Sequence, residues 1–169
     1  MFVRREYHNP LANKVRPALI NHYQSKPMKQ GVAVTLTTNS RYHHSSKTTQ
    51  SRRDKFDPIL RKWHCRLCRH FEGQNFHKKA NRHRQQEGIA FPESFYDNPH
   101  YHLILDIKEW PILEYEEVAH KIWGKFCESG TVDVQLRYAS KWEGYSSKKL
   151  HGSNRDLHNN YILIPDIIV

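Results

Sequence analysis

The order of two hydrophobic periods along the chain constrains its fold more than any other sequence feature. Residues 32–37 alternate apolar with small or polar side chains, which is the period of a strand that buries one face. A helical period then runs from Asp57 to the glycine at position 73. Later periods predict strands at 89–93 and 100–107, a helix at 114–127 and a strand at 131–137. This order predicts an α+β, ferredoxin-like or RRM-like fold: a four- to five-stranded antiparallel sheet with helices on one face and the other face open.

The length of 169 residues allows one domain with a sizeable core, and not two well-packed ones. We expect residues 1–30 to form an N-terminal arm, in which a helix can begin near Pro10, and residues 31–169 to form a single domain. Residues 39–53 are rich in Ser, Thr, His and Arg, which predicts a mobile basic loop. The apolar residues 161–169 fit either an added strand or a docking edge.

The composition favours a partner that carries phosphates. A formal net charge of +10, 13 histidines and 12% aromatic residues suit a protein that binds phosphate groups and stacks on bases, although ribosomal and membrane-surface proteins have similar compositions. No apolar run approaches the roughly 20 residues that span a bilayer, and no signal peptide is recognisable at the N-terminus. Three cysteines do not indicate a disulfide scaffold. We therefore expect a cytoplasmic protein with no membrane partner.

Two histidines in the strand at 100–107 are the first candidates for chemistry. His100 and His102 are two residues apart, so on a strand both imidazoles leave the same sheet face and can share a metal ion. Tyr101 and Leu103 point to the opposite face, beneath the helices. An isolated His-x-His is more often a solvated strand face than a metal site, so the wider sequence has to decide between the two.

The chain contains three motifs in order: Thr35-Leu36-Thr37, His100-Tyr101-His102 and a segment with Tyr145 and Lys148 three residues apart. Together they resemble the HUH endonucleases, a superfamily that is named for its His-hydrophobic-His motif and includes rolling-circle replication initiators. Val34-Thr35-Leu36-Thr37 resembles the Thr-Leu-Thr strand that opens these domains. His100-Tyr101-His102 and the apolar residues after it match the metal-binding strand. Trp142-Glu143-Gly144-Tyr145-Ser146-Ser147-Lys148 resembles the Tyr-x-x-Lys nucleophile segment. The resemblance covers about residues 32–148, and the ordered set is more specific than any one segment.

The resemblance implies a third metal ligand, because two imidazoles bind a divalent ion weakly. We expect Glu93, which ends the strand before the His-x-His strand and is brought alongside it by a short connection. Asp97 and Asp106 are the competitors, and a solvated carboxylate at a strand end is an equally common role for a residue such as Glu93. Mixed nitrogen and oxygen ligands suit Mg²⁺ or Mn²⁺ when a phosphate oxygen completes the shell.

Two tyrosines match the nucleophile pattern of the family. Tyr138 falls in step with the buried side of the strand at 131–137, so core packing accounts for it better. Tyr145 and Lys148 are three residues apart in a segment that can form a short helix, which places them on one face. We therefore expect Tyr145 to attack and Lys148 to favour its phenolate. The alternative is that Tyr145 is an ordinary surface residue, and that the lysines beside it only bind phosphate.

The expected activity is site-specific nicking and joining of single-stranded DNA through a 5′-phosphotyrosine, in rolling-circle replication or another mobile-element reaction. The chain lacks a Gly-x-x-x-x-Gly-Lys phosphate loop, so any helicase partner would be a separate protein. The DNA-contacting residues expected on the strand faces and in the basic segment are Thr35, Thr37, Arg137, Lys141, Trp142 and Lys149.

Other interpretations remain open at this point. A non-catalytic module could use the same sheet face and basic loops to hold single-stranded DNA or RNA. Within the enzyme class, an HUH transposase or a relaxase would use the same chemistry. Cys65 and Cys68, flanked by His64 and His70, also resemble part of a zinc site, but no second ligand pair follows at the usual spacing.

Overall fold

The computed structural model describes residues 27–39, 49–95, 97–136 and 161–164, with five further positions before residue 26. Five strands form one sheet in the order β4-β1-β3-β2-β5, and each neighbouring pair is antiparallel. The elements are β1 (Gly31–Thr37), α2 (Thr49–Glu72), the 3-10 helix η1 (Lys79–Arg84), β2 (Glu87–Glu93), β3 (His100–Asp106), α3 (Ile112–Gly124), β4 (Thr131–Leu136) and β5 (Ile162–Ile164). The predicted α+β class and the ferredoxin-like element order are confirmed.

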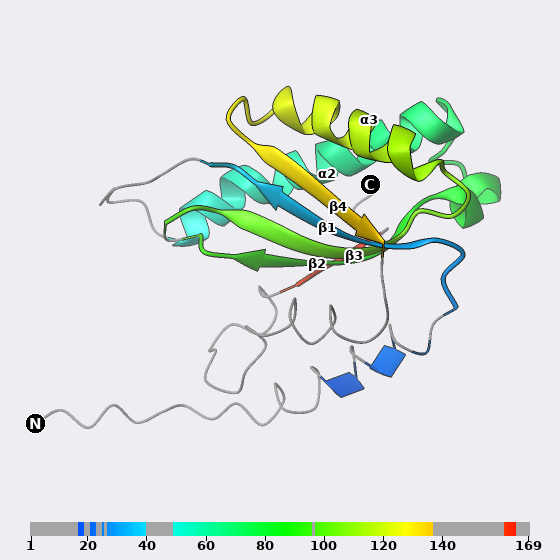
Figure 1. The fold of residues 1–169 in the computed structure, drawn as a ribbon, viewed down its shortest axis with the longest axis horizontal. Helices are drawn as coiled ribbons and strands as arrows, with labels where there is room; N and C mark the ends of the chain where they lie inside the picture. Colours follow the sequence, from blue (N-terminus) through cyan, green and yellow to red (C-terminus); the bar gives the residue numbers. More distant parts are fainter. Residues whose placement is uncertain are drawn as a thin grey trace, which may run out of the picture.

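The main core lies between the sheet and its two helices, which cover the same face (Figure 1). The two periods of the sequence produce this layer. Alternate residues of each strand, such as Leu36 on β1 and Leu103 on β3, pack against the apolar stripe of α2, which includes Leu60 and Trp63. The Trp63 and Trp123 rings meet edge to face at 6.4 Å, and so join α2 to α3.

The other sheet face is less open than the sequence predicts. Ile89, Phe91 and Ile104 form a second, smaller cluster there, against which Met28 and Tyr161 pack. Strands β2 and β3, two of the three inner strands, are therefore buried on both sides over most of their length. The expectation of an open face holds toward the sheet edges, where alternate residues of β4 and Leu163 of β5 are exposed.

Helix α2 begins earlier than the sequence predicts. The predicted start is Asp57-Pro58, yet the helix extends from Thr49, so residues 49–53 are not part of a loop. Tertiary contacts stabilise this extra part: the buried Arg52 donates a hydrogen bond to the Phe95 carbonyl at 2.7 Å. Arg53 pairs with Asp57 one turn later at 2.8 Å. These contacts offset the backbone hydrogen bond that Pro58, inside the helix, cannot make.

The ends of the other elements follow local chemistry more closely. Helix α2 ends at Glu72 and is followed by Gly73, whose φ of 76° lies in the left-handed region that glycine adopts without strain. Helix α3 begins two residues before the predicted start and ends at Gly124, after which tight turns replace the last predicted residues. A Cβ at Gly130 would lie 2.7 Å from the Thr37 carbonyl oxygen, so only glycine fits where the chain enters β4.

The apolar C-terminal segment adds an edge strand. Ile162–Ile164 pairs with β2, with Ile164 opposite Gly88. The sequence allows either a strand or a docking edge over residues 161–169, and the structure shows a strand at 162–164. No helix in the described ranges is long and apolar enough to cross a lipid bilayer.

Candidate metal centre

Strand register brings the three expected metal ligands together. Glu93 on β2 lies directly opposite His100 on β3, and His102 follows two residues along β3 on the same face. Between Glu93 and His100 the chain turns through Ser94, which has a φ of 54°. This short connection returns the chain antiparallel to itself, so the carboxylate of one strand end meets both imidazoles of the next.

The ligand atoms of the three side chains converge on one point. Glu93 Oε2 lies 3.3 Å from His102 Nε2 and 3.8 Å from His100 Nε2. One ligand atom from each residue lies within 4.8 Å of the other two. The two imidazole rings stand nearly perpendicular, with centroids 5.1 Å apart. Because the same nitrogen of each ring faces the same carboxylate oxygen, the three residues form a compact set of donors.

The remaining ring nitrogens have partners of their own. His100 Nδ1 lies 2.9 Å from the Asn98 carbonyl oxygen, which only accepts, so in the neutral imidazole Nδ1 carries the proton and Nε2 has the lone pair. His102 Nδ1 lies 3.2 Å from Thr35 Oγ1 on the neighbouring strand β1. The Thr35 hydroxyl can donate to Nδ1 or accept from Nδ1–H, and in the second arrangement Nε2 of His102 also has the lone pair. Metal-binding histidines are oriented by contacts of this kind.

The site is recessed in the sheet rather than fully exposed. The side chains of Glu93, His100 and His102 keep 10%, 20% and 9% of their surface accessible. Phe91 lies opposite His102 on β2 and is buried. Electrostatic interactions are stronger at such a position than in bulk water, and His100 is the most accessible of the three residues.

The residues present fit a divalent ion. Two imidazole nitrogens and one carboxylate oxygen make a mixed donor set, which suits a transition ion such as Mn²⁺ better than Mg²⁺. Three protein ligands leave coordination positions for a substrate oxygen or for water.

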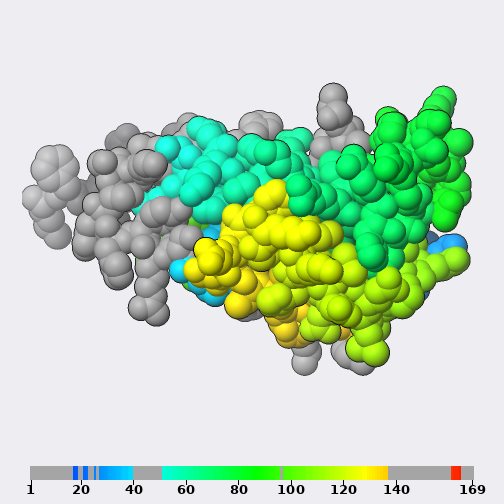
Figure 2. Space-filling view, turned by 90° about the horizontal axis from the view of Figure 1, so that it is seen from above, coloured from blue at the N-terminus to red at the C-terminus, as the bar shows by residue number. Residues whose placement is uncertain are grey.

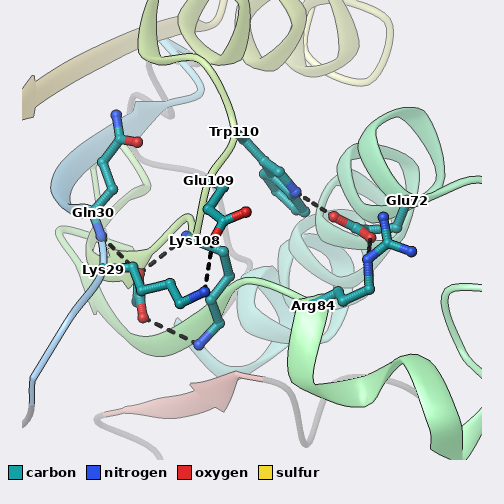
Figure 3. A network of polar contacts seen from close by, with 8 residues as sticks. Lys29, Gln30, Glu72, Arg84, Lys108, Glu109 and Trp110 are labelled. Carbon is teal, nitrogen blue, oxygen red and sulfur yellow. Dashed lines mark hydrogen bonds and ion pairs between the residues drawn. The ribbon is translucent and has the colours of Figure 1, made fainter.

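The competing carboxylates do not join this group. Asp106 is buried at the far end of β3, where its side chain accepts hydrogen bonds from the backbone N–H groups of Gln30 and Lys108 at 3.1 and 3.0 Å. Burial raises the pKa of Asp106, but these hydrogen bonds and the Lys108 ammonium outweigh it and lower the pKa overall. Figure 3 shows Gln30 and Lys108 in this polar network. Asp97 also lies outside the group.

The tyrosine between the two histidines is not available as a nucleophile. Tyr101 lies beneath α2 as predicted, fully buried, and its hydroxyl donates a 2.6 Å hydrogen bond to Asp57. Burial raises the pKa of this phenol well above its usual range, and the Asp57 carboxylate raises it further. Tyr101 therefore anchors β3 to α2.

Several predicted site residues lie outside the described residues. They are Tyr145, Lys148, the alternative nucleophile Tyr138 and the DNA-contact candidates Arg137, Lys141, Trp142 and Lys149. Of the other two candidates, Thr35 contacts His102 and Thr37 shares a 2.7 Å hydroxyl contact with Thr131. Sequence reasoning assigns Thr35 to DNA and misses its contact with His102. Strand pairing is the missing signal, because Thr35 lies opposite His102 only in this register.

Among the described residues, the cysteines and histidines on α2 do not form a group of three or more side chains that could hold a metal ion. His64 is fully buried, and its Nδ1 lies 2.6 Å from the Gln86 side-chain nitrogen. The Gln86 carbonyl accepts from Tyr115 at 3.0 Å. Burial lowers the pKa of His64 to about 3, so this imidazole is neutral at physiological pH. Cys68 lies beside it, 3.7 Å from Nε2.

The comparisons with known proteins give no relative. No family model, no curated protein and no solved structure matches the chain.

Proposed function

We propose that this protein is a metal-dependent endonuclease of the HUH type, which nicks and rejoins single-stranded DNA through a 5′-phosphotyrosine. One observation carries the proposal: Glu93 Oε2 faces Nε2 of both His100 and His102 at the end of a strand pair. Sequence order adds support, since the Thr-Leu-Thr strand lies beside the histidine strand and a Tyr-x-x-Lys segment follows. Rolling-circle replication initiation is the role that the Tyr-x-x-Lys spacing favours.

Each residue has a distinct part in the proposed reaction. Glu93, His100 and His102 would hold Mn²⁺ or Mg²⁺, which when bound polarises a non-bridging phosphate oxygen and offsets its growing charge. Thr35 and the Asn98 carbonyl orient the two imidazoles. Tyr145 loses its phenol proton to solvent, with Lys148 favouring the anion. The phenolate oxygen forms a bond to phosphorus, the bond from phosphorus to the 3′ oxygen breaks, and that oxygen takes up a proton.

The decisive experiment detects the covalent intermediate. The full chain with Mn²⁺ is incubated with labelled single-stranded oligonucleotides from its own genetic neighbourhood and analysed on a denaturing gel. We expect a protein–DNA adduct that Tyr145→Phe and His100→Ala/His102→Ala abolish and that Tyr138→Phe retains. An adduct that survives Tyr145→Phe but not Tyr138→Phe would move the nucleophile to Tyr138. Binding without cleavage across the whole oligonucleotide set would leave a non-catalytic single-stranded DNA or RNA module as the function.

A further inference from the structure

A row of cations runs along one side of helix α2, on the sheet face opposite the candidate metal centre. Lys55, Lys62, Arg66 and Arg69 are all exposed. At about 100° per residue their spacing of seven, four and three places them within about 60° of one another around the helix. The row spans about 21 Å at 1.5 Å per residue. It therefore presents a straight line of positive charge to solvent.

A second, shorter row faces the first across a groove. An open groove of about 530 Å³ lies between α2 and α3, with Arg66 and Arg69 on one side and Lys121 and Lys125 on the other. Figure 2 shows the two helices side by side on this face. The Arg66 guanidinium lies over the Phe126 ring at 4.8 Å, which holds it in place at the groove.

The acidic residues of the groove do not cancel this charge. Glu114 and Glu117 line it on the α3 side, and Glu114 is 3.2 Å from His70. Asp54 is an exposed carboxylate near the start of α2. Four lysine and arginine side chains thus stand against two carboxylates in the groove itself, and the rest of the row adds Lys55 and Lys62.

The exposed apolar and aromatic side chains of the two helices indicate which class of polyanion this face can bind. Among the described side chains of α2 and α3, Leu113 at the start of α3 is the one exposed large apolar residue, so the two helices lack the continuous apolar face that inserts into a membrane or forms the centre of a protein interface. No Phe, Tyr or Trp of α2 or α3, all of which the structure describes, is exposed either, so these helices offer no platform on which single-stranded bases could stack. Duplex DNA, with its bases enclosed and a negative charge about every 1.7 Å along its axis, needs neither feature.

We propose that the α2–α3 face, defined by Lys55, Lys62, Arg66, Arg69, Lys121 and Lys125, binds the phosphate backbone of double-stranded DNA without reading its sequence. The helices separate this face from the metal centre, which lies on the other side of the sheet. The two surfaces can therefore bind DNA at the same time. The inference does not depend on the nicking activity.

The test measures binding of the full chain to a short random-sequence DNA duplex by fluorescence anisotropy at several salt concentrations. Lys62→Glu/Arg69→Glu reverses two charges of the row and leaves the Arg66–Phe126 contact in place. We expect at least a ten-fold loss of affinity. The slope of log K against log salt should also become shallower by about 2, because each phosphate contact contributes about 0.9.

A matched control reverses two exposed cations outside the row. Arg61→Glu/Lys79→Glu changes the net charge equally, and Arg61 lies about 110° around α2 from the middle of the row. We expect this variant to lose much less affinity, and His100→Ala/His102→Ala to bind the duplex like the unmodified chain. Equal losses in both charge-reversal variants would overturn the proposal, as would binding to anionic phosphatidylserine vesicles or to an acidic polypeptide without binding to duplex. Thermal melting checks that all variants fold.

Discussion

At the scale of single residues, we expect the metal affinity of the candidate centre to depend on two atoms that are not themselves ligands. Thr35 Oγ1 contacts His102 Nδ1, and the Asn98 carbonyl contacts His100 Nδ1. Only the first of these contacts is made by a side chain, so it alone can be removed by substitution. When Thr35 Oγ1 accepts from Nδ1–H, it favours the tautomer that presents Nε2 to a metal ion, and a ring free to rotate or to change tautomer would bind such an ion more weakly.

This role predicts a difference between two substitutions at one position. Thr35→Val keeps the shape of the side chain but removes the acceptor, so we expect Mn²⁺ affinity to fall at least ten-fold. Thr35→Ser keeps the hydroxyl and should retain most of the affinity. Titration calorimetry with Mn²⁺ measures both, and equal affinities in the two variants would show that Thr35 only fills space.

At the scale of elements, α2 shows tertiary contacts overriding a local signal. Pro58 is exposed within the helix, and its ring nitrogen cannot donate to the preceding turn. The first part of α2 nevertheless persists, because Phe56 packs edge to face on Phe95 at 6.3 Å and Arg52 bonds the Phe95 carbonyl. The helix therefore contains a local weakness that packing compensates.

Replacing that proline should stabilise the protein. Pro58→Ala restores a backbone donor inside an existing helix, and we expect the free energy of unfolding to rise by about 1–3 kcal/mol. Part of the gain is offset because alanine makes the unfolded chain more flexible. Urea denaturation measures the change, with Lys62→Ala on the same helix as a control that should alter stability by less than about 0.5 kcal/mol. Destabilisation by Pro58→Ala would mean that the proline ring itself makes essential contacts.

At the scale of the whole molecule, one buried histidine links folding to pH. Burial lowers the pKa of His64 from 6.5 to about 3 in the folded protein, where Gln86 and Tyr115 complete a buried polar network. The unfolded chain binds a proton at this residue below pH 6.5, and the folded protein does not bind it until about pH 3. Stability from His64 is therefore fully present above pH 6.5 and is lost as the pH falls toward 3.

The expected slope approaches about 1.4 kcal/mol per pH unit within that window, and the total is of the order of 5 kcal/mol. Urea denaturation across the window measures it. His64→Gln, which cannot be protonated, should lower stability at neutral pH and flatten the slope. His120→Gln, at an exposed position of α3, should leave the slope unchanged. A slope that persists in His64→Gln would assign the pH dependence to other groups.

Much of this architecture could be predicted from the sequence, because strand and helix periods are local properties. Alternation at β1 and β3 sets which side chains share a face, and so the spacing of His100 and His102 is enough to place them together. The short connection after Glu93 is the local signal that places this carboxylate, rather than Asp97 or Asp106, beside the two histidines. A hairpin fixes its own register, so local sequence is sufficient to bring these three side chains together.

Tertiary structure alone decided the features that depend on distant residues. The contact of Thr35 with His102 requires β1 to lie beside β3, and the edge position of β5 requires pairing with β2. The early start of α2 depends on Phe95, and the partly covered second face depends on packing against Met28 and Tyr161. Hydrophobic periods indicate which face of an element is buried. Which neighbour buries that face is determined only when segments far apart in sequence pack together.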